Sequence, residues 1–425
     1  MKVLVVGSGG REHAIIHKLA QSNPAPQLFC APGNGGIGAQ AQCVPIKVTD
    51  LEAMTAFALE QSIDFVVVAP DDPLALGMVD ALEKAGIPAF GPTALAAQIE
   101  ASKVFSKNLM RKYSIPTADF AVFDQPEQAG DYIRSQNSFP TVIKADGLAL
   151  GKGVIIAQNL EEALEGIKSI MEDKVFGESG SRVVVEEFIT GPEVSVLAFT
   201  DGKTVLPMIS SMDHKRALDG DKGLNTGGMG VIAPNPHYTP DIAAQCMETI
   251  FLPTIRAMAA EGRPFKGCLY FGLMLTPKGS RVIEYNCRFG DPEAQAVLSL
   301  LETDLLDILM AVREERLADM EIKWKPGASA CVIMASGGYP GRYQTGCAIE
   351  GLNTAGQLES QADTTVYHAG TRLENGQYLT AGGRVLGVTA TAPSLPAALE
   401  KAYAGVECIH FADAHFRRDI GGHSH

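Results

Sequence analysis

The sequence contains no long hydrophobic run, and no stretch approaches the roughly 20 apolar residues that a membrane helix needs. A signal-peptide pattern is also absent, because residues 1–7 have the apolar pattern of a β-strand. Basic residues are few, with 35 Lys and Arg against 49 Asp and Glu, so the net charge of −14 would repel a nucleic-acid backbone. These absences predict a cytoplasmic protein with neither a membrane nor a nucleic acid as its partner.

Closely spaced cysteine pairs are missing too. The eight cysteines show no Cys-x-x-Cys spacing, which argues against a zinc knuckle or a disulfide framework and predicts free thiols. No internal repeat is present. The chain does have 425 residues, 46% of them hydrophobic and 20% charged, which is typical of a globular protein with three or four folding units.

The first 100 residues predict a doubly wound parallel sheet. Short apolar runs at 3–6, 27–30 and 65–69 alternate with helical patterns at 12–20 and 74–85. A sheet of this kind binds ligands at the carboxyl ends of its strands. We therefore expect the loops that follow the strands to form one pocket; these are residues 7–12, 31–38 and 70–74.

The rest of the chain predicts further α+β units, so the fold class is a multidomain mixture of α/β and α+β. A helical pattern at 97–113 marks a boundary near residue 100, and a smaller final domain is expected from residue 328, ending in a helix at 395–408. Between them, a hairpin turn is predicted at 276–279. A compact module precedes that hairpin, with strands expected at 141–144, 155–157 and 182–187 and a helix at 160–171. Longer helices are expected at 242–260 and 292–313.

A glycine-rich loop, Gly7-Ser8-Gly9-Gly10-Arg11-Glu12, follows the first strand and opens a helix, where phosphate groups often bind. It does not fit the dinucleotide fingerprint, because Glu12 stands in place of the third glycine and no acidic residue follows the second strand. A small phosphorylated ligand is the favoured interpretation, and a purely structural turn is an alternative. The charge of Arg11 would suit a single sugar phosphate.

Lys144 ends a predicted strand and precedes a second glycine-rich stretch, residues 145–153. Glycines allow such a loop to fold close over a ligand and to offer backbone N–H groups to phosphate oxygens. It is not a Walker loop, because three residues separate Gly147 from Gly151 and Gly153 follows the next lysine. Taken alone, the stretch is equally well explained as a flexible turn.

The apolar strand at 183–189 contains two carboxylates, and Glu193 lies a few residues further on. One interpretation is a linker between two lobes, whose backbone and Glu186 meet the edge of an adenine while Glu193 meets ribose hydroxyls. The other is a strand that runs out into solvent. The residues alone leave both interpretations open.

The segment 284–293 carries the strongest local pattern. Strand alternation puts Glu284 and Asn286 on one face, about 7 Å apart at a rise of ~3.3 Å per residue. Their oxygens suit magnesium, a hard ion that completes its shell with water and phosphate oxygens. Arg288 follows on the same face and could neutralise a phosphoryl group or clamp a carboxylate. An ordinary polar strand end is the alternative.

Two charged or glycine-bearing stretches, 211–216 and 225–230, frame a loop that we expect to act as a mobile lid. His214 need not be a base there, because phosphoryl transfer rests mainly on positioning and electrostatics. A solvated surface loop is the alternative.

Taken in order, these parts resemble an ATP-grasp enzyme, and the whole chain resembles the phosphoribosylamine–glycine ligase family. The motifs that carry the resemblance are Gly9-Gly10-Arg11-Glu12-His13, Ala31-Pro32-Gly33-Asn34, Lys144-Ala145-Asp146-Gly147-Leu148-Ala149, Asn225-Thr226-Gly227-Gly228-Met229-Gly230 and Arg288-Phe289-Gly290-Asp291-Pro292-Glu293. The last two are highly specific to that family.

The resemblance implies a division into a substrate-binding domain, two ATP-grasp lobes and a C-terminal domain. The bounds are 1–100 for the N-terminal α/β domain, 101–122 with 190–327 for the main lobe, 123–189 for the small lobe or lid, and 328–425 for the C-terminal α+β domain. In that family the carboxylate of glycine attacks the γ-phosphate of ATP, and the amine of 5-phosphoribosylamine then opens the glycyl phosphate. The implied partners are these three small molecules, and the implied cofactor is Mg²⁺ or Mn²⁺, in a monomer or weak dimer.

The same resemblance assigns roles by motif. ATP would be held by Lys103, Lys144, Gly151, Gly153, Glu186, Phe188 and Glu193. The metal would be held by Glu284 and Asn286. The catalytic candidates near glycine and the acyl phosphate are Arg288, Asp213 and Asp291, and the substrate-binding candidates are Gly9, Gly10, Arg11, Asp71 and Asn225.

One residue departs from the family pattern. Where the family has Gly-Pro-Glu-x-Pro-Leu, this chain has Ala69-Pro70-Asp71-Asp72-Pro73-Leu74, so the carboxylate of Asp71 is about 1.5 Å shorter in reach. Asp71 can still accept hydrogen bonds from ribose hydroxyls. The alternative functions are another ATP-grasp ligase or carboxylase that acts on a phosphoribosyl amine, and a non-catalytic nucleotide-binding scaffold.

Overall fold

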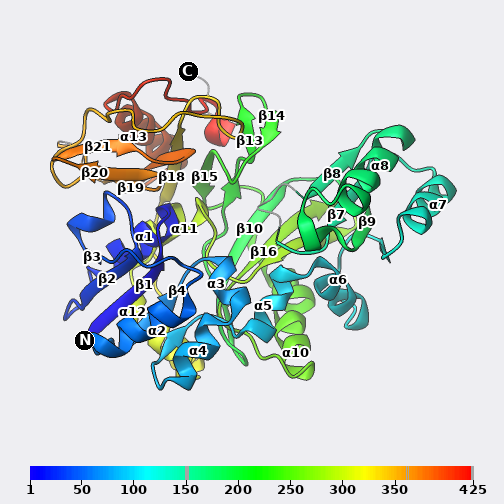
Figure 1. Ribbon diagram of the computed structural model, residues 1–425, viewed down its shortest axis with the longest axis horizontal. Helices are drawn as coiled ribbons and strands as arrows, with labels where there is room; N and C mark the ends of the chain where they lie inside the picture. The colour runs from blue at the N-terminus through cyan, green and yellow to red at the C-terminus, as the bar shows by residue number, and fades with distance from the viewer. Residues whose placement is uncertain (149–152, 360, 362, 423–425) are drawn as a thin grey trace.

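The computed structural model of the protein describes residues 1–148, 153–359, 361 and 363–422. In Figure 1 the N-terminal sheet and the C-terminal domain lie side by side, and a small lobe that carries α7, α8 and β7 to β9 stands apart at the opposite end. The long strands β10 (Glu193–Asp201) and β16 (Lys266–Thr276) lie between them. Within the described residues, no helix has the length and apolar character needed to cross a membrane.

The N-terminal sheet is parallel, as the sequence predicts, with the strand order β3-β2-β1-β4-β5. Residues 3–6 of its central strand β1 (Lys2–Gly7) have no exposed surface. Such an apolar run is what a parallel sheet covered by helices on both faces requires. The other strands are β2 (Gln27–Pro32), β3 (Gln42–Cys43), β4 (Phe65–Val68) and β5 (Ala89–Phe90), and the first helices are α1 (Gly10–Leu19) and α2 (Leu51–Glu60).

The helix expected at 74–85 is in fact two helices, α3 (Asp71–Leu76) and α4 (Met78–Lys84). Gly77 separates them with φ at +88° and ψ at 33°, in the left-handed region. Glycine adopts this conformation without the steric cost that a Cβ would bring. The earlier start of α3 places Asp71 in its first turn.

The helix expected at 97–113 is also divided, into α5 (Ala94–Ala101) and α6 (Lys103–Lys112). Ser102 has an extended backbone between them, and its hydroxyl accepts a hydrogen bond from the Phe105 N–H at 3.1 Å, so it caps α6. The same hydroxyl donates to Oδ1 of Asp146 at 2.8 Å. The cap therefore fixes Lys103 beside the glycine-rich stretch that follows Lys144.

The small lobe is a four-stranded antiparallel sheet with the order β6-β9-β7-β8. Its strands are β6 (Phe120–Phe123), β7 (Thr141–Ala145), β8 (Val154–Ala157) and β9 (Val183–Glu187), and its helices are α7 (Pro126–Gln136) and α8 (Leu160–Ile167). Three strands and α8 were expected, whereas β6 and α7 were not. Pairing of β7 with β9 sets Lys144 opposite Val184 and Val142 opposite Glu186, which brings the two polar residues to neighbouring strands.

The main lobe contains a second four-stranded sheet, with the order β11-β10-β16-β17. The predicted hairpin turn is confirmed, because Thr276 pairs with Gly279 where β16 turns into β17 (Gly279–Asn286). The helix expected at 292–313 is interrupted, because Asp304 starts a new helix by capping the Leu306 N–H at 2.9 Å. The remaining elements are β11 (Val205–Pro207), α9 (Pro240–Cys246), α10 (Leu252–Ala260), α11 (Glu293–Val297) and α12 (Leu305–Arg313).

The C-terminal sheet has the order β12-β15-β18-β22-β19, and two of its strands come from the middle of the chain. These are β12 (Met212–Asp213) and β15 (Gly230–Ala233), which flank the hairpin of β13 (Arg216–Leu218) and β14 (Lys222–Asn225). The two stretches expected to frame a lid are therefore anchored in a sheet. The other elements are β18 (Ala328–Ala335), β19 (Thr364–His368), β20 (Thr371–Glu374), β21 (Gln377–Thr380), β22 (Arg384–Ala392) and α13 (Leu395–Glu407).

Candidate active site

The glycine loop at the end of β1 packs against the main lobe. A Cβ on Gly10 would lie 2.4 Å from Nε2 of Gln295, and a Cβ on Gly9 would lie 3.1 Å from Oδ2 of Asp291. Only residues without a side chain allow this close approach. Arg11 turns toward protein groups: its Nε lies 2.6 Å from Oε1 of Glu12, and its Nη1 donates to the Phe289 carbonyl at 3.0 Å.

The Asn34 side chain joins this loop to the second predicted loop and to the C-terminal domain. Its Nδ2 donates to the carbonyls of Ser8 and His368, both at 2.8 Å, while its Oδ1 accepts from the N–H of Gly36 at 3.0 Å. The expected neighbourhood of the loops after β1 and β2 is therefore observed. The sequence did not indicate that the C-terminal domain takes part.

Asp291 lies where three parts of the chain meet. Its Oδ2 accepts from the backbone N–H of Arg11 at 3.2 Å, and its Oδ1 accepts from Nε2 of Gln295 at 2.9 Å. Arg384, from β22, lies 3.4 Å from Oδ1 and also donates to the Asp291 carbonyl at 2.7 Å. Burial alone would raise the pKa of Asp291, but Arg384 and Arg11 hold it below the usual value. With these contacts, Asp291 is an ionised group that positions its neighbours.

Arg288 is held by a glutamate that sequence reasoning missed. Its Nη2 lies 3.1 Å from Oε1 of Glu100 and 3.4 Å from Oδ1 of Asn286. Although burial opposes it, Glu100 and Asp71 raise the pKa of Arg288 above the usual value, so the guanidinium stays charged. Its buried Nε atom has no hydrogen-bond partner among the described residues.

Glu284 is surrounded by lysines from three separate segments. Lys215, just after β12, lies 3.4 Å from its Oε1, while Lys103 of α6 and Lys144 of β7 add further positive charge. Lys215, followed by Lys144 and Lys103, lowers the pKa of Glu284 to about 2 against the effect of burial, so it is ionised at neutral pH. Lys144 comes from the small-lobe sheet, whereas Lys103 and Lys215 come from outside it, so separate units contribute charge around Glu284.

The other residues predicted to bind the nucleotide differ in their environments. Glu186 is buried, with its oxygens 2.9 Å from Nζ of Lys107 and 3.1 Å from Nζ of Lys144. Phe188, beyond the end of β9, is 37% exposed, and Glu193 pairs with Lys215 at 3.5 Å. The Gly153 carbonyl accepts from the Ala145 N–H at 2.8 Å. Gly151 lies outside the described residues.

Asp213 contacts the glycine-bearing stretch after β14. A Cβ on Gly228 would lie 2.5 Å from its Oδ1, and this buried atom has no hydrogen-bond partner within the described ranges. Burial, followed by the neighbouring Glu293 carboxylate, raises the pKa of Asp213 well above the usual value. Asn225, by contrast, is exposed in β14 and is not brought into this cluster.

Four residues of these clusters were missed from the sequence: Glu100, Lys107, Lys215 and Arg384. Each is a charged side chain at least partly buried through contacts that are distant in sequence, such as the one between Arg384 and Asp291. Lys215 lies inside a stretch that was singled out, so its place next to Asp213 was a usable signal. No local pattern distinguishes the other three from surface charges.

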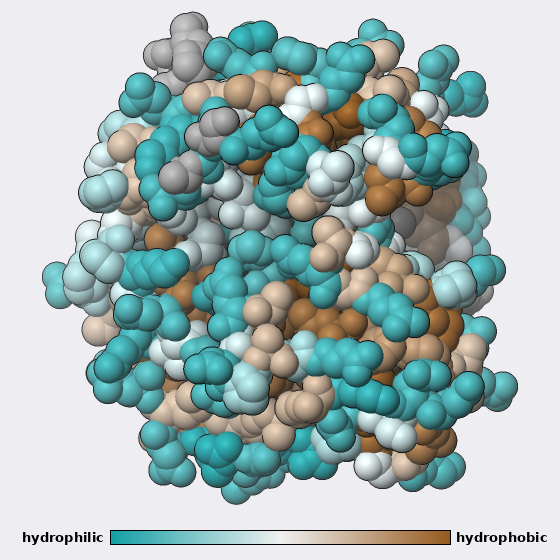
Figure 2. Space-filling view, turned by 90° about the vertical axis from the view of Figure 1, so that its left-hand side faces the viewer, coloured by the Kyte–Doolittle hydropathy of each residue, from teal (hydrophilic) through white to brown (hydrophobic). Residues whose placement is uncertain are grey.

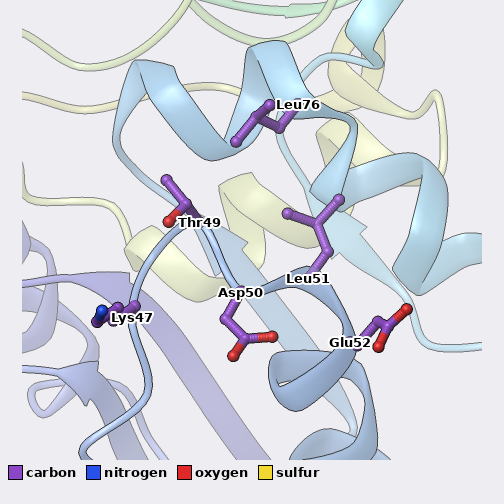
Figure 3. Close-up of a pocket in the computed structure, with 6 residues that line it drawn as sticks. All are labelled: Lys47, Thr49, Asp50, Leu51, Glu52 and Leu76. Atoms are coloured by element: carbon purple, nitrogen blue, oxygen red, sulfur yellow. The ribbon is translucent and has the colours of Figure 1, made fainter.

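A surface hollow elsewhere takes no part in these clusters. It lies beside the start of α2 and the end of α3, and Figure 3 shows that its lining side chains come from the N-terminal domain alone. They are Lys47, Thr49, Asp50, Leu51, Glu52 and Leu76. Figure 2 shows hydrophilic side chains over most of the face formed by the N- and C-terminal parts, with apolar ones in small groups between them.

Two β-rich lobes bring lysines to one ionised glutamate, and an ATP-grasp (A) domain model matches residues 101–294, so the chain is an ATP-grasp enzyme, a class that uses ATP and a divalent metal. The fold agrees with a solved structure of the biotin carboxylase domain of a Hydrogenobacter thermophilus 2-oxoglutarate carboxylase, with a TM-score of 0.75, 16% identity and 98% and 91% of the two chains covered. At that identity the likeness shows the fold alone.

Family models for phosphoribosylglycinamide synthetase match the N domain at residues 1–100, the ATP-grasp (A) domain at 101–294 and the C domain at 329–423. A phosphoribosylamine–glycine ligase of Caldanaerobacter subterraneus subsp. tengcongensis is 48% identical over 420 residues, 99% of each chain. The crystal structure of such a ligase from Thermotoga maritima has a TM-score of 0.86 at 31% identity and covers 99% of this chain and 100% of that one. The chain belongs to the phosphoribosylamine–glycine ligase family and is a ligase.

The buried pair of Lys107 and Glu186 gives a first prediction. Lys107→Met leaves Glu186 with one cation instead of two, and breaking a buried ion pair costs about 3–5 kcal/mol. We expect a lower melting temperature, and also a higher KM for ATP, because Glu186 then holds Lys144 more firmly. Thermal unfolding and ATP titration measure the two effects.

The matched control is Lys112→Met on the same helix, where the pair with Glu261 is at the surface and Lys112 is 63% exposed. This variant should leave both quantities close to their original values. Equal shifts in the two variants would contradict the argument from burial.

Proposed function

We propose that this chain joins glycine to 5-phosphoribosylamine with the cleavage of ATP to ADP and phosphate, forming glycinamide ribonucleotide in purine biosynthesis. The observation that carries the proposal is the ionised Glu284 among Lys103, Lys144 and Lys215, which provides fixed charges for phosphoryl transfer. The 48% identical relative bears the name of this ligase, which supports the choice of substrates.

The nucleotide is assigned to the space between the lobes. Lys103 and Lys144 bind its phosphates, together with the glycines at 151 and 153. The exposed ring of Phe188 and the carboxylate of Glu193 bind the nucleoside. Because the Glu186 carboxylate already pairs with two lysines, we assign the adenine contact to the backbone of β9 and give its side chain a positioning role.

Glu284 and Asn286 are the proposed metal ligands, and their chemistry fits a hard divalent cation. Glu284 is ionised and Asn286 offers a carbonyl oxygen on the same strand face. Within the described part of the chain, no group of three or more His, Cys, Asp or Glu could hold a metal, so phosphate and water oxygens complete the shell. Mg²⁺ or Mn²⁺ bound there neutralises phosphate charge.

Glycine is assigned to the space near Asp213 and Arg288. The unpartnered Oδ1 of Asp213 accepts a hydrogen bond from the glycine ammonium group, and the free Nε of Arg288 donates to its carboxylate. A carboxylate oxygen attacks the γ-phosphorus and ADP leaves, giving glycyl phosphate. The amine nitrogen of 5-phosphoribosylamine then attacks the carbonyl carbon, the carbon–oxygen bond breaks, phosphate leaves, and the nitrogen releases one proton to solvent or to the departing phosphate.

The phosphoribosyl group is assigned to the N-terminal loops. Gly9 and Gly10 open the N-terminus of α1, which favours an anion. A bound phosphate would share this end with the carboxylates of Asp291 and Glu12, which already accept backbone N–H groups there. Arg11 adds charge there, and Asp71 accepts hydrogen bonds from ribose hydroxyls. Asn225 is exposed in β14, outside the Asp213 cluster, and we propose that it contacts substrate once substrate is bound.

The choice of substrates gives a second prediction. The purified chain should release phosphate from ATP at a substantial rate only when glycine and 5-phosphoribosylamine are both present. A coupled phosphate assay with each substrate withheld in turn measures this. Equal release with another acid in place of glycine would favour a different ATP-grasp ligase, and binding of ATP without any release would favour a scaffold.

The proposed metal ligand gives a third prediction. Glu284→Gln removes the charge but keeps the shape, so turnover should fall by about 10²-fold or more, as expected for a lost electrostatic contact in the transition state. Nucleotide binding, measured by titration calorimetry, should persist because Lys103 and Lys144 are intact.

Glu315→Gln is the matched control. Lys203 and Lys266 lower the pKa of Glu315 to about 2 as well, but these three residues lie at the surface and contact none of the clusters described above. This variant should turn over at the original rate. Full activity in Glu284→Gln would exclude the metal assignment.

A further inference from the structure

The last described residues of the chain form many hydrogen bonds with the hairpin β13–β14. In Figure 1 the red end of the chain lies beside this hairpin at the top of the molecule. We call residues 415–421 the C-terminal segment. His415 begins it, with its Nε2 2.6 Å from the Ala217 carbonyl in β13 and its backbone paired with Ala335 in β18. The segment therefore ties the hairpin to the C-terminal sheet.

Arg417 forms the largest number of these side-chain hydrogen bonds. Its side chain is only 2% exposed, an unusual place for a guanidinium. It donates to Asp221 at 2.8 Å and to the Arg216 carbonyl at 3.2 Å, both in the hairpin, and it forms a two-pronged pair with Asp419 at 2.7 and 2.8 Å. Such a fork fixes orientation as well as distance.

Backbone groups and packing complete the contact. The Gly220 N–H donates to Oδ2 of Asp419 at 2.7 Å, and the Arg418 N–H donates to Oδ1 of Asp219 at 2.8 Å. Ile420 is fully buried, and a Cβ on Gly230 would lie 2.7 Å from it. The turn of the hairpin and the first residue of β15 are therefore both in contact with the C-terminal segment.

His214 connects the C-terminal segment to the stretch that contains Asp213 and Lys215. Its Nε2 accepts from the Gly421 N–H at 3.0 Å, so its Nδ1 carries the proton and donates to the Gly230 carbonyl at 3.2 Å. Burial lowers the pKa of His214, which favours this neutral form. Both ring nitrogens are used in structural bonds, and the residues on either side are Asp213 and Lys215.

We propose that the C-terminal segment is a positioning element for the reaction, which sets Asp213 and Lys215 through His214 and the hairpin. Arg417 and His214 are then positioning residues that touch no substrate. The inference rests on the proposed function, because it takes Asp213 and Lys215 to act on glycine and on the phosphoryl group.

The test compares Arg417→Met with Arg418→Met. The Arg418 side chain is exposed and stacks on Phe416, so its loss should leave kcat unchanged. Arg417→Met should lower kcat by about 10- to 100-fold, because a shift of about 1 Å at reacting groups costs on that order. The KM for ATP should stay within about twofold in both variants, because Lys103 and Lys144 lie elsewhere. Loss of folded protein would lower the apparent kcat without changing KM, so kcat is expressed per ATP-binding site, counted by calorimetric titration of each variant.

His214→Phe makes the experiment independent of how Arg417→Met folds. Phenylalanine keeps an aromatic ring at position 214 but forms neither of the two hydrogen bonds. We expect the same fall in kcat, with an unchanged KM for ATP. A kcat within twofold of the unsubstituted chain in a folded variant of either kind would overturn the inference, and so would a parallel loss of ATP binding. If the unsubstituted chain shows no glycine-dependent phosphate release, the proposed function itself fails.

Discussion

The buried carboxylate of Asp291 holds together three parts of the chain that are distant in sequence. It receives the Arg11 N–H from the glycine loop, the side-chain amide of Gln295 and the guanidinium of Arg384 from the C-terminal domain. Burial alone would favour the neutral acid, but the two arginines keep it ionised. Because stranding one of these charges in a low-dielectric interior is costly, the three parts keep a fixed arrangement. The glycine loop and Gly228, which lies beside Asp213, both pack against the segment of Asp291 and Pro292.

The positively charged side chains that gather at Asp291 and Glu284 contrast with the negative net charge of the whole protein. The net charge is −14, yet three lysines converge on Glu284 and two arginines on Asp291. Since like charges on a flexible surface would move apart, their convergence requires rigid elements, here α6, β7 and the stretch after β12. Groups held in this way need no rearrangement when charge develops in a reaction, which is why preorganised sites are effective.

The sequence predicted what repeats along the chain and missed what depends on distant contacts. Apolar runs located β1, β4, β7 and β9, and strand alternation put Glu284 and Asn286 on one face. The breaks at Gly77 and Ser102 were missed because helical patterns continue across them, although one residue is left-handed and the other caps α6. The partners of site residues were missed for a stronger reason: Arg384 meets Asp291 across 93 positions, and nothing local marks it.

Strands β12 and β15 belong to a sheet whose other members are β18, β22 and β19, far along the chain. Because β15 pairs with β18 and β18 pairs with β22, a growing polypeptide that has already released residues 212–233 carries an unpaired strand edge until residues 384–392 follow. The nucleotide lobes can assemble during this interval, whereas the surroundings of Asp213 cannot. A chain that stops before β22 therefore lacks Arg384, the arginine whose charge acts on both Asp213 and Asp291.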